Sequence, residues 1–317
     1  MLRMMPENTS IDFLSKRKIC AILSSIFLLV TVLLLGFKGL NWGIDFAGGT
    51  LVQVKTEKQV EIATLRKAIL DVGIEGATLQ EFEGSGGELL VRVPEKDSEN
   101  ANATVTAEKV EKALNTVAGG VEVRRVEFVG PQIGDELRIT GLIALLLSMA
   151  AILVYISIRF EMRYAIGAIA ALGHDILLTV GAFAFLQKEV TMTVLAALLT
   201  IIGYSLNDTI VVFDRVRENI AKQGKMTLRD ILNLSVNEML NRTLMTSVTT
   251  LVVLLALFLF GGGVIHDFAF TLMFGVIVGT YSSVFVAAPV VLAMEGYYQR
   301  LKEKEAETPG FMSSTEK

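Results

Sequence analysis

Six long apolar blocks constrain this chain more than any other feature of its sequence. Each holds close to the ~20 residues that a helix needs to cross the hydrocarbon core of a bilayer. Apolar residues make up 52% of the chain and charged residues 20%, against about 25% charged in a typical soluble domain. The pattern predicts an α-helical polytopic membrane protein whose six transmembrane helices cover residues 19–37, 137–158, 165–186, 192–213, 244–260 and 268–294.

The first block directly follows three consecutive basic residues, Lys16, Arg17 and Lys18. A secretory signal peptide has a shorter apolar region and a cleavage site of small residues. This block is long enough to span a bilayer instead, so we expect residues 19–37 to be retained as the first transmembrane helix, after an N-terminal segment at residues 1–18.

Basic residues in the short connecting segments predict the orientation, because such residues accumulate on the cytoplasmic side. If the N-terminus is cytoplasmic, the short outside loops carry only Lys188. Both the N-terminus and the C-terminal tail at residues 295–317 are then cytoplasmic. Eight basic residues lie on the inside under this assignment: Arg159, Arg163, Arg215, Arg217, Lys222, Lys225, Arg229 and Arg242.

The longest insertion, residues 38–136, is expected to form one small domain outside the cytoplasm. Alternating and helical apolar spacings follow one another along it in the order βαββαβ, which is the ferredoxin-like pattern. The glycine-rich run at residues 84–87 predicts a hairpin turn. The expected strands and helices cover residues 50–55, 57–72, 78–83, 88–93, 105–117 and 121–129.

A second insertion, residues 214–243, mixes charges with apolar residues at helical spacing. This pattern predicts a cytoplasmic amphipathic helix lying along the inner face of the membrane. The charged tail is expected to be disordered beyond about residue 305.

Few ionisable or amide side chains fall within the predicted spans, where such groups are costly and usually face a bundle interior or a wet cavity. His174 and Asp175 lie near the middle of the third span, and Asn207 and Asp208 lie in the inner third of the fourth. Asp208 is about five residues, or ~8 Å, from the inner end of its apolar run. Arg242 lies where the fifth span begins, so Asp208 and Arg242 can meet across two helices.

Each polar group has a functional and a structural interpretation. Asp208 is either a carboxyl that changes protonation as protons cross the membrane or half of a static ion pair with Arg242. His174 and Asp175 either belong to a proton path or join helices by hydrogen bonds, since adjacent helical residues point about 100° apart. Small residues of the sixth span predict close helix packing: Gly275, Gly279, Ser282, Ser283, Ala287 and Ala288.

Several other classes of function lack a matching pattern. Two histidines and one cysteine give no metal-ligand cluster, and no phosphate-binding loop or nucleophile set predicts a cofactor or an intramembrane enzyme. The net charge of −4 argues against a nucleic-acid binder. A transport subunit is the expected class.

Five motifs occur in one order along the chain. They read GIDFAGGT at residues 43–50, VGPQIGDEL at 129–137, His174-Asp175, YSLNDTIVVFDRVREN at 204–219, and Asn241-Arg242-Thr243. The set resembles the SecD/SecF family of protein-export membrane proteins, within the RND superfamily, over roughly residues 10–295. The single small external domain is similar to the SecF branch of that family.

The resemblance implies a subunit of the bacterial inner membrane that uses the proton-motive force to promote polypeptide export. It implies SecD as a partner that supplies six more helices, action on the SecYEG translocon and on the translocating polypeptide, and association with YajC. It also implies that Asp208 and Arg242, with the neighbouring Asn207, belong to the proton path.

The glycine motif contains Gly43, Asp45, Gly48 and Gly49. Because glycine adopts backbone angles closed to other residues, Gly48 and Gly49 are expected to form a hinge between the first span and the external domain. A plain turn is the alternative.

Two other functions remain open. A non-catalytic scaffold would stabilise the translocon without using protons, but it has no need of the costly Asp208. A small-molecule RND exporter normally carries two large external insertions, whereas this chain has one, of 99 residues.

Overall fold

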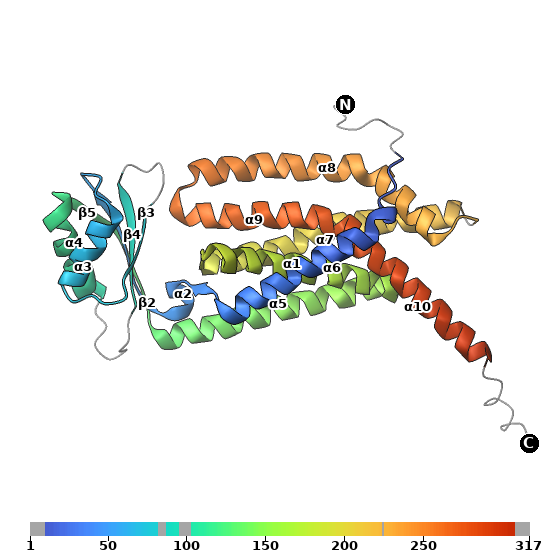
Figure 1. Cartoon of the computed structure of the whole chain (residues 1–317), viewed down its shortest axis with the longest axis horizontal. Coiled ribbons are helices and arrows are strands. Elements are labelled where there is room, and N and C mark those ends of the chain that lie inside the picture. Colours follow the sequence, from blue (N-terminus) through green and yellow to red (C-terminus); the bar gives the residue numbers. More distant parts are fainter. Residues whose placement is uncertain (1–9, 82–86, 95–102, 224, 308–317) are drawn as a thin grey trace, which may run out of the picture.

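Apolar helices dominate the structure, a computed structural model that describes residues 10–81, 87–94, 103–223 and 225–307. Within these residues six helices are long and apolar enough to cross a membrane, and they lie side by side in one bundle (Figure 1). The helices are α1 (Arg17–Phe37, after the short turn η1, Leu14–Lys16), α5 (Pro131–Arg159), α6 (Met162–Leu186), α7 (Met192–Lys222), α8 (Leu228–Phe260), and a sixth built from α9 (Gly262–Ser282), η2 (Ser283–Ala287) and α10 (Ala288–Glu307).

The sixth helix, α6 and α7 form the centre of the bundle. About half of the apolar window of α6 is buried, against 11% for α1 and α5. Glycines allow the central helices to approach closely: a Cβ on Gly275 would overlap the side chain of Ile201, and one on Gly279 would lie 3.1 Å from Ser205 Cβ. The outer faces of α1, α5 and α8 are left for lipid or a partner protein.

The domain predicted to lie outside the cytoplasm, called the external domain below, is a four-stranded sheet with two helices on one face. Neighbouring strands are antiparallel throughout, in the order β3-β4-β2-β5. This is the predicted ferredoxin-like arrangement, and the expected architecture of six spans with one small α+β domain is confirmed. The elements are β2 (Gly49–Thr56), α3 (Ile62–Asp71), β3 (Thr78–Glu81), β4 (Glu88–Val93), α4 (Ala103–Ala118) and β5 (Val121–Val129).

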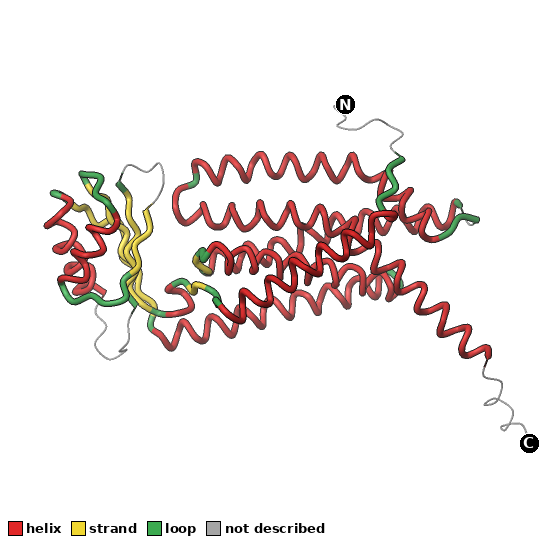
Figure 2. Tube along the Cα trace, in the orientation of Figure 1, coloured by secondary structure: helices red, strands yellow, loops and turns green. Residues whose placement is uncertain are grey.

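Alternation along the strands decides which face the helices cover. Val52 and Val54 on β2 and Leu89 and Val91 on β4 are buried in one cluster with α3 and α4. The opposite, helix-free face is turned toward the bundle (Figure 2). Of the predicted hairpin turn at residues 84–87, only Gly87 lies within the described residues.

The connection between the fourth and fifth spans differs from the predicted surface helix. Residues 214–222 extend α7, and residues 228–243 are the first part of the continuous helix α8. The two extensions bind each other, because Arg215 Nε donates to Glu238 Oε2 at 2.6 Å and Asn219 Nδ2 donates to Ser235 Oγ at 3.0 Å. The apolar residues of this segment therefore pack between helices, where Leu232 is fully buried.

Both described ends of the chain lie at the end of the bundle opposite the external domain (Figure 1). Near the N-terminus, Asn237 Nδ2 and Asn233 Nδ2 on α8 donate to Ile11 O at 2.8 and 3.0 Å. At the other end α10 continues to Glu307, so the predicted tail is helical in its first part. Residues 308–317, where disorder was expected, lie outside the described residues.

Candidate functional site

Polar side chains within the spans gather where α6, α7 and the sixth helix meet. Asp175 on α6 is fully buried. Its Oδ2 accepts hydrogen bonds from Ser205 Oγ on α7 at 2.6 Å and from Ser282 Oγ at 2.7 Å, and its Oδ1 lies 3.0 Å from Nδ1 of His174. The three contacts satisfy a carboxyl that would otherwise be costly to bury.

His174 extends this cluster to α1. Its Nε2 lies 3.2 Å from Ser24 Oγ, and its ring stacks on Tyr281 with centroids 6.0 Å apart. The Tyr281 hydroxyl lies 3.1 Å from Ser24 Oγ and donates to the carbonyl oxygen of Cys20. Although adjacent helical residues diverge, the structure brings His174 and Asp175 into one buried cluster.

Asp208, on α7, is half-buried and bonded through both carboxyl oxygens. Thr243 Oγ1 on α8 donates to Oδ1 at 2.6 Å, and Ser283 Oγ on the sixth helix donates to Oδ2 at 2.9 Å. The carboxyl therefore faces this chain's own bundle and is held by two neutral hydroxyls from two other helices.

Arg242 does not contact Asp208 directly. Its side chain is exposed, and among the described residues no hydrogen bond or ion pair joins the two, although the guanidinium lies within Coulombic range of the carboxyl. The reason is geometric: neighbouring residues of a helix point about 100° apart, so when Thr243 faces Asp208, Arg242 turns outward. The direct pairing considered from the sequence is absent in this structure.

Asn207 is also exposed, because it precedes Asp208 by one position. Further polar side chains lie on the outer faces of the same helices, and each hydroxyl donates to a carbonyl of its own helix: Thr200 on α7, and Thr246 and Thr249 on α8. An exposed amide such as that of Asn207 within a membrane span is costly against lipid and normally faces protein or water. These two helices therefore present a surface that suits a partner's helices.

The serines around the two carboxyls were missed as site residues. The sequence predicts only a packing role for Ser282 and Ser283, and Ser24 lies in no motif. Ser205 alone has a signal, because it lies three residues before Asp208 in the YSLND motif. Nothing local in the sequence indicates that adjacent serines on one helix reach carboxyls on two others.

The glycine motif forms a junction between the domain and the bundle. Strand β1 (Asn41–Trp42) pairs in parallel with β6 (Glu189–Val190), in the loop before α7. The short helix α2 (Ile44–Ala47) follows. Asp45 Oδ2 accepts the backbone N–H of Met192 at 2.8 Å, which caps the first turn of α7, and the Gly43 N–H donates to Val190 O at 2.8 Å.

Gly48 and Gly49 are required by their backbone angles and by their neighbours. Their φ values are +75° and +132°. A Cβ on Gly48 would lie 2.8 Å from Pro131 Cα, and one on Gly49 would lie 2.6 Å from the carbonyl oxygen of Val93. The pair forms a tight turn between α2 and β2 that packs against the start of α5 and the end of β4, so any hinge motion here must break these contacts.

We expect Gly49→Ala to destabilise this junction by more than about 2 kcal/mol, because the new methyl group meets backbone at a positive φ. Gly73→Ala is the matched control: its φ is +81°, but a Cβ there meets nothing within 4 Å, so it should cost only about 1 kcal/mol. Protease cleavage between residues 38 and 136 measures the difference. Equal cleavage of the two variants would contradict the packed-junction interpretation.

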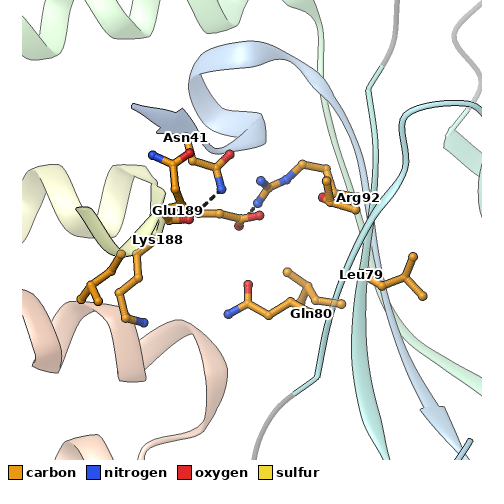
Figure 3. Close-up of a pocket in the computed structure, with 10 residues that line it drawn as sticks. Asn41, Leu79, Gln80, Arg92, Lys188 and Glu189 are labelled. Carbon is orange, nitrogen blue, oxygen red and sulfur yellow. Dashed lines mark hydrogen bonds and ion pairs between the residues drawn. The ribbon is translucent and has the colours of Figure 1, made fainter. Parts of the chain in front are cut away.

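An ion pair joins the external domain to the end of the bundle that faces it. Arg92 on β4 contacts Glu189 on β6, with side-chain exposures of 10% and 13%, and Figure 3 shows the guanidinium directed at the carboxylate. Nearby, Lys188 Nζ lies 2.5 Å from Asp267 Oδ1 of the sixth helix. A cavity of about 300 Å³ lies beside these residues, bounded also by Asn41 and Gln80.

Comparison with known proteins gives consistent matches. The model of the SecD/SecF GG motif matches residues 33–60, and that of the C-terminal region of the protein export membrane protein SecD/SecF matches residues 109–296. The chain is 52% identical to protein translocase subunit SecF of Magnetococcus marinus over 95% of this chain and 98% of the relative. Its identity to the Vibrio alginolyticus SecF is 44%, over 98% of both chains.

Two solved structures are similar to the whole chain. The crystal structure of SecDF, a translocon-associated membrane protein from Thermus, superposes with a TM-score of 0.83 at 34% identity, covering 92% of this chain and 40% of that one. A crystal structure of SecDF in a super-membrane-facing form gives a TM-score of 0.69, also at 34% identity, covering 97% of this chain and 41% of that one. The chain therefore spans about two-fifths of the length of these SecDF chains.

Proposed function

The chain belongs to the SecD/SecF family of protein-export membrane proteins, and we propose that within it the chain is a proton-motive-force-coupled subunit that acts with SecD to promote polypeptide export across the bacterial inner membrane. The matching relatives are named protein translocase subunit SecF, and six helices in the described part of the chain are long and apolar enough to span a membrane; the chain is therefore a multi-pass membrane protein with a role in protein export.

The observation that carries the proton-coupled function is how Asp208 is held. A hydroxyl can donate to an ionised carboxylate and can equally accept a hydrogen bond from a protonated one. Thr243 and Ser283 therefore suit both protonation states of Asp208. A static ion pair would require direct contact with Arg242, and that contact is absent within the described residues, which favours the titrating carboxyl over the structural pair.

The outward polar faces of α7 and α8 support SecD as the partner. Asn207 and Arg242 are exposed in this chain, yet they lie within or beside membrane spans, where such groups need protein or water around them. This chain covers only 40% of the solved SecDF chain, which supports a partner that corresponds to the rest of that chain. SecYEG, YajC and the translocating polypeptide are the further partners in this proposal.

A scaffold function is the alternative, and reconstitution separates the two. The chain, SecD and SecYEG would be placed in vesicles, with proton influx followed by a pH-sensitive dye and export by protection of a secretory polypeptide. We expect export to fall to the level of SecYEG alone when the proton gradient is dissipated. Unchanged stimulation without a gradient would favour the scaffold; sodium-dependent stimulation would identify a different coupling ion.

The proposed orientation places both termini in the cytoplasm and the external domain on the far side. The eight-to-one excess of basic residues supports it, as does the position of both described ends opposite the domain. A periplasm-dependent reporter fused after Glu95 should be active, and the same reporter fused after Gln223 should be inactive. A cytoplasm-dependent reporter should give the reverse, and swapped signals would overturn the topology.

A further inference from the structure

Two adjacent serines of the sixth helix bind carboxyls on two different helices. Ser282 Oγ donates to Asp175 on α6 at 2.7 Å, and Ser283 Oγ donates to Asp208 on α7 at 2.9 Å. Both serines are fully buried. At Ser283 the helix changes from α to a single π-helical segment, Ser283–Ala287. Such segments are rare inside α-helices and are frequent at functional sites.

We propose that Asp175 is a second proton-binding carboxyl and that Ser282 and Ser283 couple its protonation to that of Asp208. The proposal rests on the proton-coupled function proposed above and extends it to Asp175, which is more deeply buried than Asp208. In this arrangement the serines are positioning residues, because they orient the two carboxyls and neither gain nor lose a proton.

Each serine has one hydroxyl proton and two acceptors within reach. Ser282 Oγ lies 2.7 Å from Asp175 Oδ2 and 3.2 Å from Gly279 O. Ser283 Oγ lies 2.9 Å from Asp208 Oδ2 and 3.1 Å from Thr280 O. When the carboxyl is ionised, the hydroxyl donates to it. When the carboxyl takes up a proton, it donates to the hydroxyl oxygen, and the serine proton turns to the backbone carbonyl.

This exchange affects the helix itself. Gly279 and Thr280 belong to the turn that leads into the π segment, and a serine that bonds back to the preceding turn competes with backbone hydrogen bonds and bends the helix. Because Ser282 and Ser283 are consecutive, a change at one displaces the other. Protonation of either carboxyl therefore changes the position of the serine hydroxyl that donates to the other carboxyl. Thermodynamic linkage makes this coupling reciprocal.

The surroundings of Asp175 favour a proton-binding role over simple helix packing. Within the described part of the chain no lysine or arginine pairs with it; the titratable groups of its cluster are His174, Tyr281 and, beside Tyr281, Cys20. Arg242 is the charged group that acts on Asp208. The carboxyl of Asp175 therefore depends on hydrogen bonds from neutral hydroxyls and on the ring of His174, and an asparagine would fill the same position in a purely structural network.

Infrared spectroscopy of the chain reconstituted with SecD tests the inference. We expect two protonated-carboxyl bands that titrate with pH, of which Asp175→Asn removes one and Asp208→Asn the other. Each substitution should also change the proton affinity of the remaining carboxyl by about five-fold or more, the lower range of typical coupling between sites. In the double variant Ser282→Ala/Ser283→Ala both bands should persist. In that variant, replacing one carboxyl should no longer change the proton affinity of the other, so this mutual shift should be lost.

Ser247→Ala is the matched control. Ser247 on α8 is buried, and its hydroxyl bonds to Thr280 Oγ1 of the sixth helix, which carries Ser282 and Ser283, at 2.7 Å. Removing this hydroxyl should leave the mutual shift intact. If Asp175→Asn removes no titrating band, the second site is overturned. If the shift persists in the double-serine variant, the serines do not carry the coupling. If Asp208→Asn removes no titrating band, the result counts against the proposed function instead, so the two failures are distinguishable.

Discussion

Replacing Asp208 with asparagine is expected to lower proton influx to the background of empty vesicles and to abolish the gradient-dependent part of export. Asparagine keeps the size of the side chain, and its amide oxygen can still accept from Thr243 or Ser283, so the bundle should assemble with SecD as before. It cannot take up or release a proton. Dye-monitored flux and polypeptide protection, measured on one vesicle preparation, should therefore fall together.

Asp214→Asn is the control for this substitution. Asp214 lies six residues further along α7, is half-exposed and lies 3.7 Å from Arg159, a surface pair of the kind that contributes about 0–1 kcal/mol. Flux should be unchanged in this variant. Arg242→Ala should lose flux, whereas Arg242→Lys should keep part of it, because the positive charge remains. If Asp208→Asn assembled normally and conducted protons at the wild-type rate, Asp208 would be a structural residue and the scaffold would become the leading function.

Breaking the ion pair between Arg92 and Glu189 is expected to release the external domain from the bundle. Both side chains are almost fully buried, so Arg92→Met leaves an uncompensated carboxylate and should weaken docking by about 3–5 kcal/mol. Replacing both residues with methionine removes both charges and should restore much of the docking, because apolar pairs of similar volume often replace buried ion pairs without loss.

Docking can be measured as the width of the distance distribution between two spin labels. The labels are placed at Lys109 on α4 and Leu259 on α8, which are both exposed, in a chain whose Cys20 has been replaced with serine. Arg92→Met should broaden the distribution and the double variant should narrow it again. Arg124→Met, which removes an exposed pair with Glu122 on the same domain, should have no effect. A narrow distribution in Arg92→Met would mean that the glycine junction alone fixes the domain.

The proposed proton site was only partly predictable. A charged residue in an apolar run is conspicuous, so Asp208, His174 and Asp175 could be selected from the sequence as candidates. The partner of Asp208 could not, because Arg242 and Thr243 are adjacent and either can face α7 until the rotation of α8 about its axis is known. The structure turns Thr243 inward. Serines carry no such signal, since a buried Ser packs like alanine unless an acceptor lies opposite.

Six spans and the βαββαβ order follow from the sequence alone, because each depends on hydropathy or periodicity within about 20 residues. The tertiary structure decided what depends on the relative rotation and depth of separate helices. It extended α7 and α8 through the segment expected to be a surface helix, because residues such as Leu232 and Val236 find a buried partner surface there. It also brought Ser282 and Ser283 to two carboxyls more than 70 residues away in the chain, a contact set by helix packing and by no local pattern.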